Sequence, residues 1–477
     1  MTDLDAWLYG THVAVVRRAA TGRLSIDFTP QGLQRWGTGA SLVSMQLPLL
    51  TKSPHSAVVQ AWLRGLMPEG RARIRLAERA GVDPNDVLGF LGHYGRDTAG
   101  ALVLVPEGDD PGQPDRPLKD LSEQEIADLL AQADEAGAAD QASSLAGLET
   151  KIVLTRTATG WSMPTPKAPS THIVKLSRPE GSRTADLIDT EVAALELARY
   201  AGVSDVQAHL HTFAGTRTIV VTRYDRIADI GAGTVRRLHQ EDAAQMLGLN
   251  TDNPFRKFQY GAAIPSLAAI AAKLTDIGVS LEPLLALTTV NVAIGNVDAH
   301  AKNVSVLHLP DGSHQLAPAY DIAMHLHQNT GETRFAMDVA GARDMHTLGA
   351  AHLMDEASRW TMPHRRAVLT LHDTLERLSA GMAEIDRDAH PGVAEAAWDI
   401  VGARIDALHG ELRRDFPLPS KRPRGGSRSP QSRVPRGHPQ GGRFTALETG
   451  SGSSVKPASD VDARTGQPHR EHPKPFS

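Results

Sequence analysis

The spacing of apolar positions divides the chain into an N-terminal module and a larger second module. In the first module, β-like alternation at residues 12–18 and 23–28 is followed by helical periodicity at 56–67 and 70–81, and a β-like run at 100–106 ends it. Pro, Gly and Asp then cluster without apolar periodicity over 106–117, which is typical of a linker. The pattern predicts an α/β unit over residues 1–108.

A connecting segment over 109–138 is expected to hold a helix at 121–136, because Ser122 and Glu125 have the spacing of a capping box. The second module, over 139–416, begins with β-like runs, inserts a helix, and returns to β-like runs before it becomes helical. These runs lie at 151–155, 172–176, 207–213 and 217–224, with a later strand pair near 304–309. The order predicts an α+β fold with a small β-rich lobe and a larger helical lobe.

The amino-acid composition of the C-terminal end differs from that of the rest of the chain. Residues 417–477 include 10 Pro, 8 Gly and 9 Ser, and only seven are Val, Leu, Ile, Met, Phe, Trp or Tyr. Such a segment cannot bury enough apolar surface to offset its ordering entropy, so we expect a disordered tail. Its eleven Lys and Arg against four Asp and Glu give it +7, whereas residues 1–416 carry −12. The tail is either a solubilising extension or a weak contact to nucleic-acid phosphates.

Several classes of protein and site are excluded. The chain has no Cys, which excludes disulfides, thiolate zinc sites, iron–sulfur clusters and cysteine catalysis. The N-terminus, MTDLDAWLYG, carries acidic residues where a signal peptide has basic ones. The longest apolar stretch, 281–297, is interrupted by Glu282, Asn291 and Asn296, so it does not resemble a membrane span. We therefore expect a cytoplasmic protein.

Candidate chemistry concentrates around residue 300. Asp298 and Asn303 in DAHAKN have the Asp-x4-Asn spacing of a kinase catalytic loop. This spacing lets one loop hold a carboxylate against the attacking hydroxyl and an amide oxygen against Mg²⁺. Eighteen residues later, PAYDIA places Asp321 after a β-like pair, where a kinase needs a second Mg²⁺-binding carboxylate.

Two further residues have the context of a kinase. Lys175 lies in a β-like run, THIVKLS, as does the kinase lysine whose ammonium neutralises ATP phosphates. The helical pattern that follows has Ile188, Val192 and Leu195 on one face, and Glu191 borders that face, where it could pair with Lys175. Each feature alone is common, but their order on the expected elements favours a phosphotransferase.

Two loops complete the predicted nucleotide site. SSLAGLETK, at 143–151, precedes the first strand of the second module and could cover phosphates with backbone N–H groups, although its single Gly is a poor match to a Gly-rich loop. Between the lobes, VVTRYDR is expected to form the hinge, with the backbone of 222–224 facing an adenine edge.

With these motifs in this order, the chain resembles the HipA family of toxin–antitoxin serine/threonine kinases. The matching motifs of the second module are SLAGLETK, STHIVKLS, TRYDR, LHQEDAAQMLGL, DAHAKN and PAYDIA. Those of the first module are SMQLPLL, LRGLMPEG and YGRDTAGALVLVPE, and the similarity covers roughly residues 4–415. The resemblance implies a kinase-like fold with a HipA-type N-terminal subdomain, and ATP- and Mg²⁺-dependent phosphorylation of a protein hydroxyl. The best-known target of the family is the aminoacyl-tRNA synthetase for glutamate.

Carried over residue by residue, the resemblance implies that Asp298 is the catalytic base and that Asn303 and Asp321 bind Mg²⁺. Glu191 would form the structural ion pair with Lys175, and Ser144 falls where the family autophosphorylates. The residues expected to bind ATP are Ala146, Gly147, Leu148, Glu149, Thr150, Lys151, Lys175, Arg223, Tyr224, His300, Lys302, Asn303, Tyr320 and Asp321. The family usually has Gln and Glu before its loop lysine, where this chain has Leu148, Glu149 and Thr150.

Expected partners are a HipB-like helix-turn-helix antitoxin, a protein substrate, and DNA mainly through the antitoxin, with no membrane. Two alternatives stay open: an inactive pseudokinase that acts as co-repressor with the antitoxin, and a small-molecule kinase. The intact set of Lys175, Asp298, Asn303 and Asp321 favours an active enzyme.

Two H-x-H pairs suggest a different chemistry, because alternate residues of a strand project to the same side and could ligate a metal. The pairs are His209/His211 and His325/His327. No third ligand at a fixed spacing accompanies either pair, so a catalytic zinc site is disfavoured.

Overall fold

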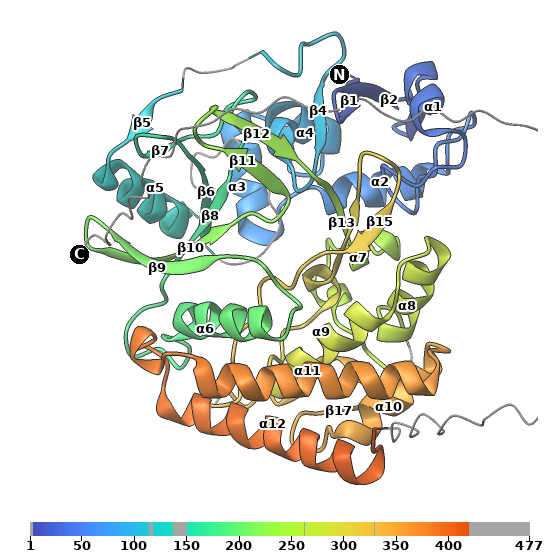
Figure 1. The fold of residues 1–477 in the computed structure, drawn as a ribbon. Coiled ribbons are helices and arrows are strands. Elements are labelled where there is room, and N and C mark those ends of the chain that lie inside the picture. The colour runs from blue at the N-terminus through green and yellow to red at the C-terminus, as the bar shows by residue number, and fades with distance from the viewer. Residues whose placement is uncertain (1–2, 114–117, 137–149, 262, 329, 419–477) are drawn as a thin grey trace, which may run out of the picture. The chain divides into compact units, whose positions relative to one another are not determined.

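The computed structural model describes residues 3–113, 118–136, 150–261, 263–328 and 330–418, with its elements labelled in Figure 1. These residues belong to one compact unit that ends at Pro419. Along the chain they form the N-terminal module, a small lobe and a large lobe. Within these described ranges, no helix is long and apolar enough to cross a membrane.

The N-terminal module is an antiparallel sheet with helices packed on it and an apolar core of its own. The strand order is β3-β2-β1-β4, so the closing strand pairs with the first one. Its elements are β1 (Leu4–Leu8), β2 (Thr11–Arg18), β3 (Leu24–Phe28), α1 (Pro30–Trp36), α2 (Ser56–Gly65), α3 (Gly70–Ala80), α4 (Val87–Tyr94), η1 (Gly95–Asp97) and β4 (Leu102–Pro106). The apolar pattern did not predict β1, α1 or α4. Helix α4 is buried at five of its eight positions, so it lacks the polar face that makes a helix recognisable.

The small lobe is a sheet with strand order β5-β7-β6-β8-β10-β9, and α5 packs against it. The predicted capping box is confirmed, because Ser122 Oγ accepts from Glu125 N at 3.2 Å and Glu125 Oε2 accepts from Ser122 N at 2.8 Å. The expected strands are present as β6, β8, β9 and β10. The elements are β5 (Asp120–Leu121), α5 (Glu123–Ala136), β6 (Lys151–Arg156), β7 (Trp161–Ser162), β8 (His172–Leu176), α6 (Leu187–Tyr200), β9 (Ala208–Phe213) and β10 (Thr216–Thr222).

The large lobe is mainly helical, and Figure 1 shows α11 and α12 side by side, with α9 packed against both. The elements of this part of the chain are β11 (Arg226–Asp229), β12 (Thr234–Arg237), β13 (His239–Asp242), α7 (Ala243–Met246), η2 (Pro254–Lys257), α8 (Leu267–Asp276), α9 (Glu282–Ile294), η3 (Ala301–Asn303), β14 (Ser305–His308), β15 (His314–Leu316), β16 (Arg334–Val339), β17 (Ala342–Asp344), α10 (Ala350–Arg359), α11 (His364–Glu384), η4 (Arg387–Ala389) and α12 (Glu395–Asp415). The strand pair expected near 304–309 is β14 and β15, and β13 pairs with β14 as the third strand of the sheet.

The expectation that this part is otherwise helical was wrong at two hairpins, β11–β12 and β16–β17. Three of the four residues of β11 are exposed, so this strand has no apolar alternation to detect.

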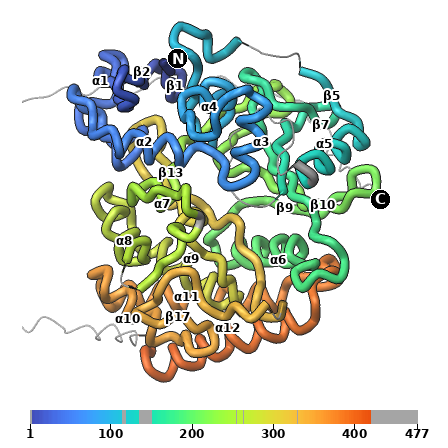
Figure 2. Tube along the Cα trace, turned by 180° about the vertical axis from the view of Figure 1, so that it is seen from behind, coloured from blue at the N-terminus to red at the C-terminus, as the bar shows by residue number. Residues whose placement is uncertain are grey.

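The N-terminal module packs directly on the large lobe. Figure 2 shows α2 beside α7, and the two helices are in contact. Gln46 Nε2 donates to the carbonyl of Met246 at 2.6 Å, and Tyr9 Oη donates to the carbonyl of His308 at 2.5 Å. The N-terminal module is therefore attached to the large lobe at α7 and at β14.

Candidate active site

The first component of the site is an ion pair between the sheet of the small lobe and α6. Lys175 lies on β8, between β6 and β10, and only 7% of the residue is exposed. Its Nζ lies 2.9 and 3.0 Å from the two carboxylate oxygens of Glu191. Because Ile188 and Leu195 are buried in the core on the same helix, Glu191 is held toward the sheet. The structure thus brings these two predicted residues together.

Asp321 is the second component, and it contacts the same ammonium. Lys175 Nζ donates to Asp321 Oδ1, while 43% of the Asp321 side chain stays exposed. The backbone of Asp321 has a φ of 55°, a conformation that is uncommon for a non-glycine residue and often occurs at functional positions. Burial raises the pKa of its carboxyl, but Lys175 outweighs this effect, with a smaller contribution from Lys151, so the pKa is lowered. Asp321 is therefore ionised at neutral pH.

The third component is the loop after α9. Gly295 ends the helix with a φ of 71°, and Asn296 then accepts from the backbone N of Asp298 at 3.1 Å through its side-chain oxygen. Asn303 Nδ2 donates to the Asp298 carbonyl at 3.0 Å and to the Asp321 carbonyl at 3.5 Å. Asn303 therefore joins the two segments that carry the acids, and 51% of the Asp298 side chain is open to solvent.

His300 and Lys302, in the same loop, are buried. The ring of His300 lies edge-on to Phe258, with centroids 5.2 Å apart, and burial together with nearby Lys257 lowers the pKa of His300 to about 3. Its imidazole is therefore neutral at physiological pH. Lys302 Nζ lies 3.3 Å from Asp242 and 3.4 Å from Glu69. The Lys302 ammonium is therefore directed at two carboxylates, and the contribution of Lys302 to ATP binding stays a prediction.

The hinge residues differ in where their side chains lie. The rings of Tyr224 and Tyr320 have centroids 5.1 Å apart, and Tyr320 Oη donates to the Lys302 carbonyl at 2.7 Å. Arg223 is 3% exposed, and its guanidinium donates to both oxygens of Asp225, at 2.9 and 2.7 Å. Any contact of Arg223 with a nucleotide would therefore have to come from its backbone.

The predicted phosphate loop is only partly described. Lys151 begins β6, directly opposite Lys175, and Thr150 Oγ1 donates to Asp134 at 3.1 Å. Ser144 and the predicted ATP ligands Ala146, Gly147, Leu148 and Glu149 lie outside the described residues.

The paired histidines do not lie together in a way that favours a metal. The rings of His209 and His211 are edge-on, with centroids 6.4 Å apart, and His327 Nε2 pairs with Asp186 at the start of α6. Among the residues that the structure describes, no three His, Cys, Asp or Glu side chains converge as a metal site. A Mg²⁺ site needs fewer protein ligands, since the ion is commonly held by one or two carboxylates together with substrate phosphates and water.

Sequence reasoning missed Glu69 and Asp242, which pair with Lys302, and Lys257, which pairs with Glu69. The first two lie in LRGLMPEG and LHQEDAAQMLGL, motifs that carried the family resemblance without a role for these acids. Their pairing with Lys302 joins positions far apart in the chain, which no local pattern could reveal.

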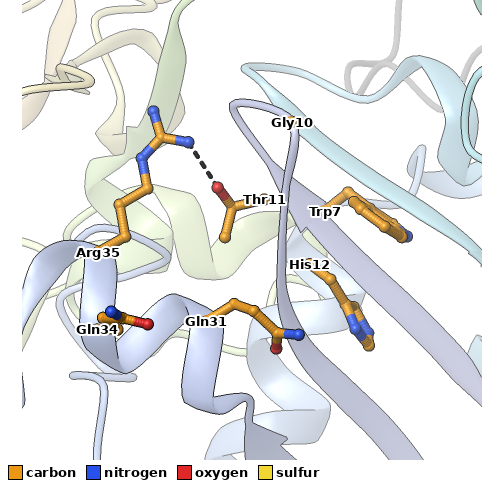
Figure 3. A pocket seen from close by; sticks show the side chains of 7 residues that line it. All are labelled: Trp7, Gly10, Thr11, His12, Gln31, Gln34 and Arg35. Carbon is orange, nitrogen blue, oxygen red and sulfur yellow. Dashed lines mark hydrogen bonds between the residues drawn. The ribbon is translucent and has the colours of Figure 1, made fainter.

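A separate hollow lies on the N-terminal module (Figure 3), with a volume of about 420 Å³. Arg35 borders it and donates to Thr11 Oγ1 at 2.5 Å, and the rings of Trp7 and His12 are stacked 5.0 Å apart. Its lining residues are Trp7, Gly10, Thr11, His12, Gln31, Gln34 and Arg35. All of them belong to the N-terminal module, so this hollow contains none of the predicted site residues.

Comparison with known proteins gives a consistent family. The model of the HipA-like C-terminal domain matches residues 143–382, and that of the HipA N-terminal domain matches 4–105. A protein of Sinorhizobium fredii named "Putative kinase Y4mE" is 31% identical over 331 residues, covering 67% of this chain and 76% of its own. The "Serine/threonine-protein kinase toxin HipA" of Shewanella oneidensis is 25% identical over 383 residues, covering 76% of this chain and 86% of its own.

A solved structure also matches, a complex of HipA, HipB and operator DNA from Shewanella oneidensis MR-1. One of its chains has a TM-score of 0.67 and 21% identity, with 86% of this chain and 97% of that chain covered. This likeness confirms the predicted fold class, an α+β kinase-like fold with an N-terminal α/β subdomain.

Proposed function

Because the chain belongs to the HipA family, we propose that it is an ATP- and Mg²⁺-dependent serine/threonine protein kinase and the toxin of a toxin–antitoxin pair. The observation that carries the proposal is the Lys175 ammonium, which contacts both Glu191 and Asp321. Asn303 in turn links Asp321 to the loop of Asp298. This is the set of groups that phosphoryl transfer requires of a kinase.

The residues present fit Mg²⁺. Asp321 offers a partly exposed, ionised carboxylate, and the Nδ2 of Asn303 is committed to two carbonyls, so its Oδ1 is the end of the amide available to a cation. Carboxylate and amide oxygens are suitable hard ligands for this ion. When bound, Mg²⁺ would neutralise charge on the phosphates and orient them.

Side chains of the protein itself would carry out the other parts of the reaction. Asp298 would accept the proton of the substrate hydroxyl, and its half-exposed side chain is open to an incoming protein. Lys175 would neutralise phosphate charge, and Glu191 would hold it in reach from α6. Tyr224 and Tyr320 would border the nucleotide at the hinge.

We propose a HipB-like antitoxin as partner, with DNA reached mainly through it. The support is that the matching Shewanella HipA was solved together with HipB and operator DNA. A translation component such as an aminoacyl-tRNA synthetase is the proposed substrate class, and this rests on the family resemblance alone.

Replacing the proposed base tests the activity. Asp298→Asn should lower kcat by on the order of 10²–10⁴ with ATP affinity nearly intact. Expression of the wild type should slow growth, and expression of Asp298→Asn should not. Asp276→Asn, an exposed acid at the end of α8, is the matched control and should behave as wild type. Full phosphoryl transfer by Asp298→Asn would show that Asp298 is not the catalytic base. A wild type that transfers no phosphate, yet represses with an antitoxin, would favour the co-repressor.

A further inference from the structure

Glu69 is a buried acid of the N-terminal module that faces the large lobe. It precedes the first turn of α3, and 7% of the residue is exposed. Its two carboxylate oxygens face two lysines of the second module, with Lys302 Nζ at 3.4 Å and Lys257 Nζ at 3.8 Å. The carboxylate of Glu69 therefore faces side chains that lie outside its own module.

These groups form a balanced cluster of two acids and two bases. Asp242 is the second acid, with Oδ2 3.3 Å from Lys302 Nζ and Oδ1 accepting from Gln245 N at 2.8 Å. Burial lowers the pKa of Lys302, but Asp242 and Glu69 outweigh it, so the pKa is raised. Since an unpaired buried charge is costly, removing one acid leaves a cation that must move toward water or another partner.

Lys302 is next to a residue of the candidate active site, and Lys257 is next to a residue that packs against it. Lys302 precedes Asn303, and the Lys302 carbonyl accepts from Tyr320, the neighbour of Asp321. Lys257 precedes Phe258, whose ring packs edge-on against His300. Movement of either ammonium would therefore shift backbone that holds the site.

We propose that Glu69 is a positioning residue for the catalytic loop, by which the N-terminal module holds Asn303 and His300 in place. It acts through Lys302 and Lys257 and does not itself contact a reacting atom. The proposal rests on the proposed kinase function and adds that the active loop is completed by a carboxylate from a different module.

The test compares Glu69→Gln with the wild type in the full chain. We expect kcat to fall at least tenfold while KM for ATP changes less than twofold, because Lys175 and Glu191 are held independently. Glu69→Asp, which keeps the charge, should recover part of the loss. Glu78→Gln, at an exposed position of the helix that follows Glu69, is the matched control and should keep the wild-type kcat.

Two measurements separate positioning from general stability. In Glu69→Gln, amide hydrogen exchange should accelerate in residues 298–304 and stay unchanged in β8 and α6. In a double-mutant cycle, Glu69→Gln should add little to the loss already caused by Lys302→Met.

A wild-type kcat in Glu69→Gln would overturn the proposal. So would a lowered melting temperature with unchanged exchange in 298–304, or losses that add fully in the double mutant. If the wild type itself shows no phosphoryl transfer, the kinase function fails, and the exchange comparison still decides whether Glu69 holds this loop.

Discussion

Asp97 offers the most direct test of how the N-terminal module is attached. It is 3% exposed and accepts from Arg226 at 3.0 Å, with Arg237 at 3.8 Å and Arg223 at 4.0 Å. Asp225 is the second acid of this cluster. Burial raises the pKa of Asp97, but Arg226 and the other two guanidinium groups outweigh it, so the pKa is lowered. Asp97→Asn keeps the size of the side chain and removes its charge.

The magnitude follows from the charge balance of the cluster. Three buried guanidinium groups face two carboxylates, so the cluster is already short of negative charge. In agreement, burial and the neighbouring Arg226 lower the pKa of Arg237 to about 9. After the substitution, Asp225 alone would face three arginines. Breaking a buried pair by removing one partner costs about 3–5 kcal/mol, and we expect a loss in that range.

Urea unfolding at pH 7, followed by circular dichroism, measures this loss as a change in the free energy of unfolding. Asp109→Asn is the control, because its pair with Arg96 spans 3.6 Å and 53% of the Asp109 side chain is exposed. Such a surface pair is worth about 0–1 kcal/mol. A loss of under about 1 kcal/mol for Asp97→Asn would show that the cluster relaxes easily and would refute the reasoning.

Three other outcomes are expected. Lys175→Met should reduce kcat by on the order of 10²–10³ because it removes the cation between two carboxylates; wild-type turnover would contradict this. Burial and His308 lower the pKa of His239 to about 4, below its unfolded value of about 6.5. Between these two pKa values the unfolded chain binds more protons than the folded chain. The contribution of His239 to the free energy of unfolding is therefore complete above about pH 6.5 and is lost as the pH falls toward 4. In urea unfolding measured from pH 4 to 8, His239→Gln should make the free energy of unfolding less dependent on pH. The family resemblance implies that Ser144 belongs to the phosphate loop, where a phosphate group would add about −1.5 to −2 charges and repel the nucleotide. Ser144→Asp should therefore have little activity, and mass spectrometry after incubation with ATP should find this serine modified.

Some elements were predicted correctly because their apolar positions have a regular period. Strand β3 buries Leu24 and Ile26 at alternate positions, and helix α5 buries Ile126 and Leu130 on one face, so local periodicity was sufficient. Helix α4 is buried at five of its eight positions, and β11 is exposed at three of its four, so neither shows the contrast between faces on which such a prediction depends.

The same limit applies to the site. Lys175, Asp298, Asn303 and Asp321 were found because short motifs place each on its element, and the fold then brings them together. The partners of Lys302 could not be found this way, because Glu69 lies more than 200 residues earlier in the chain. A sequence motif can indicate that a lysine is present near a nucleotide site, but the direction of its ammonium depends on packing between modules.

The N-terminal module is attached to the large lobe mainly through polar contacts, because the two have separate apolar cores. The N-terminal module and the large lobe have separate buried cores, and in the described residues Met45 is the side chain of the module that packs against the large core. The contact is instead made largely by polar groups, namely the hydrogen bonds of Gln46 and Tyr9 and the buried charges at Asp97 and Glu69. Apolar contacts tolerate small shifts, whereas a buried ion pair tolerates few geometries and is costly when broken. An interface of this kind fixes the register of the module against the hinge and the catalytic loop, which is the requirement for Glu69 to hold that loop.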